Sequence, residues 1–322
     1  MHLVLPFAFA RSPGARQALA SLPLPHLSAL LRRLQRVAVD EGDELSLTPP
    51  HERVLAQALG WPPGPDDDGL LPLAAHAAQQ AGLPGSNDGA QGWAFVAPTH
   101  WHLGTEQMSL ADPHSLALEE ADELALLTAL HPLFDAADGW QLHRLAPSRW
   151  LAAHPLLAHL PTASLDRVIG RNVDPWLAAP THHRTALRQL HRLQAEAQMV
   201  LHTHPVNDAR SARGQLPINS LWFSGSGAPR PPASLPPDVT WDERLRAPAL
   251  AEDWPAWAQA WQALDAGPLR ELLAPAATAS LRLSLCGDRH AHHYALPVAR
   301  PWWQRGWLAP AGPTPLAALE GL

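Results

Sequence analysis

Six polar side chains of types that bind anions gather in one short block of the sequence. They are His202, His204, Asn207, Arg210, Arg213 and Asn219. Guanidinium and amide groups hold a phosphate or a carboxylate through several directed, charge-assisted hydrogen bonds. Arg171 would add positive potential, and we expect a small anionic ligand to be bound by His204, Asn207, Arg210, Arg213 and Asn219. The alternative, which we call loop stapling, is that these side chains only hold the loop together through local hydrogen bonds, with Asn and Asp as helix caps and Arg on the surface.

Histidine pairs at alternate positions suggest metal ligands, because alternate residues of a strand share a face. One group comprises Asp288, His290, His292 and His293, and a second comprises His202 and His204, joined by His100 and His102. The chain has 19 histidines, so such groups also arise by chance. The alternatives are a solvent-facing turn and histidines bonded to nearby carbonyls. We assign no metal site, and the candidate ligands for Mn²⁺ or Zn²⁺ in an active enzyme are His202, Asp288, His290 and His292.

Two other residue types are less informative. Cys286 lies in an apolar alternating stretch, which favours a buried, inert thiol. As the single cysteine, it excludes an intramolecular disulfide and a Cys-based zinc site. The 14 tryptophans are typical of core packing, although Trp101 could instead form an aromatic platform for a ligand.

The charge balance excludes one class of partner. The formal net charge of the 322 residues is −7, and no basic run interleaves with aromatic residues, so we expect no nucleic-acid partner. No apolar run approaches the roughly 20 residues that a membrane helix requires. The apolar segment from Leu3 to Ala10 has no Lys or Arg before it, which favours a buried strand over a signal peptide. We therefore expect a cytoplasmic protein without a membrane partner.

Periodicity places the polar block between a helix and a strand. The pattern of residues 182–201 predicts a long helix, and that of residues 218–223 predicts a strand. Between them, Asn207-Asp208 is expected to cap the N-terminus of a short helix that stops at Gly214. A polar block beside a strand's carboxyl end fits the ligand crevice of an open α/β sheet. Other patterns predict a helix over 115–131, a helix containing Trp254, Trp257 and Trp261, and a hairpin over 281–298.

A proline-rich stretch suggests where the chain divides. Residues 228–238 (APRPPASLPPD) are incompatible with regular structure, because proline lacks the amide donor. We expect an α/β core over residues 1–237 and a C-terminal helix and hairpin over residues 238–322, packed on the core or joined with it in a single domain.

Parts of the sequence resemble two known families. His204-Pro205-Val206-Asn207 with Arg210, Gly214, Pro217, Asn219, Gly225 and Gly227 resembles a block of the archaeal-type cofactor-independent phosphoglycerate mutases, in the alkaline-phosphatase-like superfamily. A broader similarity, from about residue 20 to residue 290, is to the bacterial RpfE-type regulatory proteins. It rests on residues 42–47, 49–53, 99–101, 111–113, 166–171 and 285–289.

The resemblance implies a mostly parallel central sheet flanked by helices, and a phosphorylated three-carbon acid as ligand. The mutases carry a metal-binding Gly-Asp-Gly after the first strand and an Asp-x-His-Gly run, and this chain has Pro6-Phe7-Ala8 at the first position and no match to the second. The leading hypothesis is therefore a mutase-like pseudoenzyme that binds a small anion or acts as a regulatory partner. The alternatives are an active metal-dependent mutase or phosphatase, and a protein–protein regulatory module without a ligand.

Overall fold

The chain folds as two compact units. The computed structural model describes residues 1–64, 66–104, 107–177, 183–274, 281–297 and 314–322. The terminal unit combines Met1–Glu44, Pro49–Trp61 and Ser234–Leu322. The inserted unit combines Leu45–Thr48 and Pro62–Ala233. This division differs from the expected one at residues 1–237 and 238–322, because the N-terminal segment forms its sheet with strands from the end of the chain.

The terminal unit contains a five-stranded sheet in the order β2-β11-β10-β1-β9. Its strands are β1 (His2–Leu5), β2 (Gln35–Asp40), β9 (Val239–Trp241), β10 (Arg282–Cys286) and β11 (Ala291–Ala295). β1 is parallel to both β9 and β10, whereas β11 is antiparallel to both β10 and β2. The expected hairpin is confirmed as β10–β11. The expectation of a mostly parallel sheet is wrong, since this sheet is mixed.

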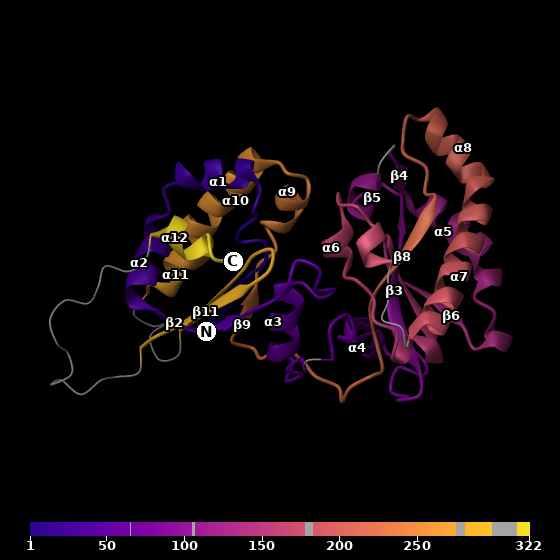
Figure 1. Ribbon diagram of the computed structural model, residues 1–322, viewed down its shortest axis with the longest axis horizontal. Coiled ribbons are helices and arrows are strands. Elements are labelled where there is room, and N and C mark those ends of the chain that lie inside the picture. The colour runs from indigo at the N-terminus through magenta and orange to yellow at the C-terminus, as the bar shows by residue number, and fades with distance from the viewer. Residues whose placement is uncertain (65, 105–106, 178–182, 275–280, 298–313) are drawn as a thin grey trace, which may run out of the picture. The chain divides into compact units, whose positions relative to one another are not determined.

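Helices cover both faces of this sheet (Figure 1). They are α1 (Pro13–Ala20), α2 (Pro25–Arg33), α3 (Pro50–Ala58), α9 (Arg246–Leu250), α10 (Trp254–Leu264), α11 (Arg270–Leu272) and α12 (Pro315–Leu319). A π-helical turn, Asp265–Leu269, joins α10 to α11. The buried Asp265 carboxylate accepts hydrogen bonds from the backbone N–H groups of His26 and Leu27, so it caps the start of α2.

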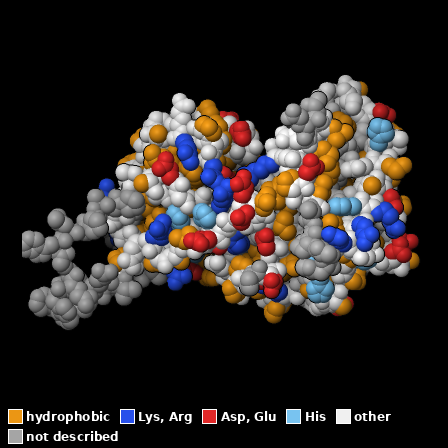
Figure 2. All heavy atoms as spheres, viewed as in Figure 1, with side chains coloured by type: hydrophobic (Ala, Val, Ile, Leu, Met, Phe, Trp, Pro, Cys, Tyr) orange, Lys and Arg blue, Asp and Glu red, His pale blue; other side chains and the backbone are white. Residues whose placement is uncertain are grey.

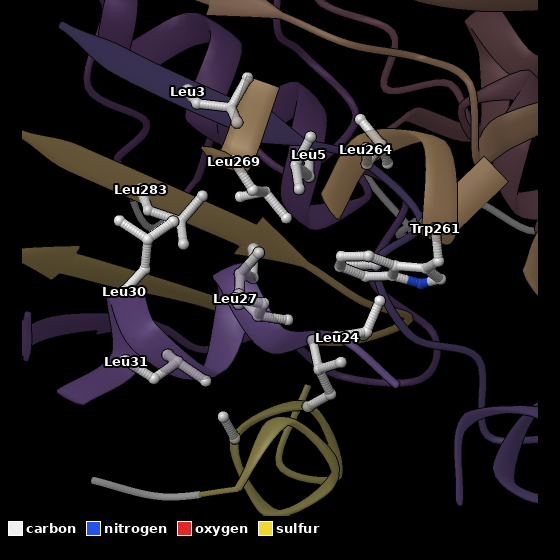
Figure 3. Packing of buried hydrophobic residues seen from close by; sticks show 14 of the residues in the cluster. Leu3, Leu5, Leu24, Leu27, Leu30, Leu31, Trp261, Leu264, Leu269 and Leu283 are labelled. Carbon is white, nitrogen blue, oxygen red and sulfur yellow. The ribbon is translucent and has the colours of Figure 1, made fainter. Parts of the chain in front are cut away.

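The core of the terminal unit is rich in leucine. Leu3 and Leu5 of β1 alternate with residues of the opposite face and point at the helices. Figure 3 shows Leu27 and Leu30 of α2 packed against them, with Trp261 of α10 beside the same cluster. α3 covers the other face, where its Val54 packs with Val4, Cys286 and Ala291.

The inserted unit contains a separate, fully antiparallel sheet in the order β6-β7-β3-β8. A two-stranded β4–β5 hairpin projects beyond the end of β3. The strands are β3 (Gly92–Thr99), β4 (Trp101–Leu103), β5 (Met108–Leu110), β6 (Gln141–Ala146), β7 (Arg149–His154) and β8 (Ser220–Gly227).

Helices lie on both faces of the four-stranded sheet (Figure 1). They are α4 (Leu73–Gln80), α5 (Glu120–Leu130), α6 (Leu165–Val168), α7 (Arg184–His202) and α8 (Pro205–Ala212). Short 3₁₀ turns occupy Pro113–Leu116, His131–Leu133, Ala136–Asp138, Pro155–Ala158 and Asp174–Trp176. α4 packs against Trp93 and Leu151, whereas α7 packs against the opposite face through Leu193 and Ala197. None of the helices described here is both long and apolar enough to cross a membrane.

Candidate functional site

The polar block connects the end of α7, the whole of α8 and the start of β8. His204 is the N-cap of α8, and its Nδ1 accepts a hydrogen bond from the Val206 amide at 3.3 Å. Asn207 therefore lies inside the helix instead of capping it, which corrects the sequence-based assignment. The helix ends before Gly214, as expected, and Gly214 adopts φ +71°, a conformation that glycine tolerates.

Asn207 joins the end of α7 to the start of β8. Its side chain is buried, and its Nδ2 donates to the carbonyl oxygens of Leu201 and Ile218 at 2.7 Å each. Its Oδ1 accepts from the Ile218 amide at 2.8 Å. The amide group thus satisfies main-chain groups at a helix terminus that would otherwise lack partners.

The two arginines of the block behave differently from each other. Arg210 is 0% exposed, and its Nε and Nη2 donate to the carbonyls of Leu216 (3.0 Å) and Leu116 (2.6 Å). Arg213 is partly exposed, and its Nη2 forms an ion pair with Asp122 at 2.5 Å. Arg210 Nη1 lies 3.8 Å from the same carboxylate, so one acid of α5 balances both guanidinium groups.

Asn219 holds the β4–β5 hairpin in place. Its Oδ1 accepts from the Trp101 amide at 2.7 Å, and its Nδ2 donates to the Trp101 carbonyl at 3.0 Å. Arg171 lies on an exposed turn after α6. The block is therefore brought together in space, but Asn207, Arg210 and Asn219 direct their hydrogen bonds to the main chain. These three side chains hold local segments together, as the loop-stapling alternative expects, although Asn207 is not a helix cap and Arg210 is buried instead of lying on the surface.

The candidate metal ligands are engaged separately. His290 Nδ1 accepts from the Gly42 amide, His292 Nδ1 lies 3.1 Å from the Ala318 carbonyl, and Asp288 accepts from the Arg11 amide. His100 Nδ1 lies 2.7 Å from the Pro217 carbonyl, and its ring is 4.4 Å from that of His102. Within the described residues, no three His, Cys, Asp or Glu side chains are grouped so that they could hold a metal ion.

A groove of about 700 Å³ lies in the inserted unit, between the β4–β5 hairpin and the C-terminal half of α7. We call it the hairpin groove. Its lining residues are Trp101, Leu103, Met108, Ala195, Gln198, Met199, His202, Thr203 and Asn219. Figure 2 shows a strip of hydrophobic side chains on the part of the surface where Figure 1 places β4 and the end of α7.

Five of the residues that line the hairpin groove are apolar, and the other four, Gln198, His202, Thr203 and Asn219, are polar. Leu103 and Met199 are 80% and 75% exposed, the highest fractions among the large apolar side chains of the described residues. Trp101 is 9% exposed and stacks at a tilt on Trp222. Its indole N–H has no hydrogen-bond partner among the described residues. His202, one of the candidate metal ligands, also lines the groove, next to Thr203.

Sequence reasoning did not find this groove, although three of its residues were singled out. Trp101 was considered as a platform, His202 as a metal ligand and Asn219 as an anion ligand. The missed signal was Met199, an apolar residue outside the buried stripe of Leu190, Leu193 and Ala197 on α7. Only the hairpin, held by Asn219, turns this exposed methionine into one wall of a groove.

Two solved structures are among those similar to this chain. No protein-family model and no curated protein matches the sequence. One similar structure is that of the PH0037 protein from Pyrococcus horikoshii, with 14% identity over 92% of this chain and 87% of that chain and a TM-score of 0.48. Another is a cofactor-independent phosphoglycerate mutase from Thermoplasma acidophilum, with 14% identity over 92% of this chain and 89% of that chain and a TM-score of 0.34. Both TM-scores are below 0.5, so neither likeness assigns an activity to this chain.

Proposed function

We propose that this protein is a regulatory binding protein, and that its inserted unit takes an apolar part of a partner molecule into the hairpin groove. The observation that carries the proposal is the pair of exposed side chains, Leu103 and Met199, on either side of a cavity of about 700 Å³. A volume in this range is typical of sites that bind ligands or partner side chains.

The polar block supports this proposal as a scaffold. Asn219 fixes Trp101 at the base of the hairpin, and Asn207 fixes the end of α7 against the strand that follows. Both walls of the groove are therefore attached to the segment between the end of α7 and the start of β8. The resemblance to the RpfE-type regulatory proteins points in the same direction, whereas the resemblance to the mutases concerns residues that bond to the main chain.

The groove can be tested with the environment-sensitive dye anilinonaphthalene sulfonate. Met199→Glu places a charge in an apolar wall, and because Met199 is exposed, the variant should fold normally. We expect dye affinity to fall about tenfold or more, which corresponds to about 1.4 kcal/mol. The matched control is Leu124→Glu, since Leu124 is 45% exposed on α5 and does not line the groove.

Unchanged dye affinity in a folded Met199→Glu protein would contradict the proposal. A coupled assay for interconversion of 3- and 2-phosphoglycerate with added Mn²⁺ addresses the alternative of an active mutase. Chelator-sensitive turnover in that assay would support the alternative.

A further inference from the structure

The exposed face of α7 extends beyond the hairpin groove. Arg188, Arg192, Ala195, Met199 and His202 follow one another at spacings of four, three, four and three residues. Residues at these spacings lie above one another on one side of a helix. All five are exposed, so they form one continuous surface stripe.

The two halves of this stripe differ in chemistry. The C-terminal half, with Ala195 and Met199, is the apolar wall of the hairpin groove. The N-terminal half is basic, and Arg184, four residues before Arg188, extends it by one helical turn. We call Arg184, Arg188 and Arg192 the arginine stripe. Eleven residues separate Arg188 from Met199, which is about 16 Å along a helix axis.

The arginine stripe retains positive charge for a partner. Arg192 is 77% exposed and lies 3.5 Å from Glu196, an exposed pair of the kind that contributes little to stability. Arg188 Nε donates to the Arg184 carbonyl, which leaves its charge uncompensated by that bond. A net positive patch on a protein of formal charge −7 is a local feature that selects for an acidic partner.

We propose that the partner of the hairpin groove is an acidic amphipathic peptide helix that lies along α7. Its apolar side chains would enter the groove beside Met199 and Leu103, and its carboxylates, two to three turns away, would pair with Arg192 and Arg188. This inference rests on the proposed function, because the groove supplies the apolar anchor. Helices bound in grooves commonly use anchors at such spacings, and methionine adapts its shape to them.

The test uses a fluorescein-labelled, 18-residue helical peptide with leucines on one face near one end and glutamates 7 and 11 residues from them. Fluorescence anisotropy with the full chain measures its affinity. Arg188→Glu/Arg192→Glu should weaken binding about tenfold or more at low salt, since two charge pairs become repulsive. Arg270→Glu, in the terminal unit, is the matched control and should have no effect. Binding by the wild type should also weaken as salt is raised.

The outcomes separate this inference from the proposed function. If Met199→Glu abolishes dye and peptide binding but the double charge reversal leaves peptide affinity unchanged, the acidic partner is wrong and the groove stands. If Met199→Glu alters neither, the proposed function itself fails. A variant peptide with lysines in place of the glutamates should bind Arg188→Glu/Arg192→Glu better than the wild type. Binding to vesicles of anionic phospholipid with no binding to the peptide would overturn the inference in favour of a lipid surface.

Discussion

Asn207 illustrates how a residue that could bind a ligand becomes part of the scaffold. Both N–H groups and the oxygen of its amide are bonded to main-chain atoms of Leu201 and Ile218. A ligand at this amide would have to break those bonds, and each buried group left without a partner costs about 1–3 kcal/mol.

We therefore expect Asn207→Ala to lower the free energy of unfolding by about 2–4 kcal/mol, since three buried main-chain groups lose their partner. Urea denaturation monitored by circular dichroism measures the change. The control is Asn87→Ala, because Asn87 is exposed and accepts a single long bond from Gln79, and it should change stability by less than about 0.5 kcal/mol. Full stability in Asn207→Ala would show that the amide is available for another role.

The sequence predicted where the polar residues would gather but not where they would point. Asn207, Arg210 and Asn219 do lie together, as the short spacing required. Their bonding depends on carbonyls that α7, Leu116 and Leu216 leave without helical or strand partners. The Leu116 carbonyl lies 94 positions from Arg210 in the sequence, whereas Leu201 and Leu216 each lie six positions from the side chain that binds them. Even for these near neighbours, residue type and spacing do not distinguish an arginine that binds the main chain from one that binds an anion.

At the scale of elements, long amphipathic patterns in the sequence predicted the helices well, but the sequence did not predict which strands pair or in which direction. The helix expected over 182–201 is α7 (Arg184–His202), and the tryptophan-containing helix is α10. The helix expected over 115–131 is shorter, because a 3₁₀ turn and extended residues precede α5. Strand direction failed because the partners of β1 are β10 and the three-residue β9, which local periodicity does not relate to it.

Three strands of the terminal unit share a partly buried chain of hydrogen bonds. Ser284 Oγ of β10 lies 2.7 Å from His2 Nε2 of β1 and 2.7 Å from His293 Nδ1 of β11. Burial lowers the pKa of His2 to about 4, assisted by His293 and Arg282 and opposed by Asp238. Burial also lowers the pKa of His293, and nearby Asp40 opposes this shift. Both imidazoles are thus neutral at pH 7.

This arrangement predicts acid sensitivity of the terminal sheet. Between pH 6.5 and about 4, the unfolded chain binds a proton at His2 that the folded chain does not, so stability falls as the pH is lowered through this window. Denaturation midpoints at pH 7.5, 6, 5 and 4 measure the fall. His2→Gln keeps a polar side chain but cannot titrate, and should flatten the curve. An equally steep curve in that variant would assign the sensitivity to other groups.

The whole molecule is a discontinuous unit that contains a second unit as an insertion. All four strands of the antiparallel sheet and the β4–β5 hairpin come from residues 92–227. The chain passes between the units after Glu44, Thr48, Trp61 and Ala233. The last of these positions lies in the proline-rich stretch 228–238, whereas the one at Pro62 lies in a segment of Pro, Gly and Asp that is equally typical of a surface loop.

This organisation predicts that a fragment of the inserted unit folds on its own, whereas a fragment from the end of the terminal unit does not. A fragment of residues 62–233 should fold alone and unfold cooperatively, although it loses the bonds from Leu47 and Thr48 to Asp68, Gly69 and Ser164. A fragment of residues 234–322 should remain unfolded, because β10 would lack β1. Circular dichroism and thermal melts of both fragments test this. Cooperative melting of the second fragment, or none in the first, would contradict it.

The pairing of β1 with β10 also constrains how the protein is made. His2 and Ser284, which are hydrogen-bonded in the folded sheet, are 282 positions apart in the sequence. His2 is therefore synthesised long before Ser284. At synthesis rates of roughly 5–20 residues per second, the first strand waits about 15–60 s for its neighbour. The inserted unit can complete its own sheet during that interval. Until β10 has been synthesised, β1 lacks this partner, and an apolar strand with an unpaired edge is prone to premature association.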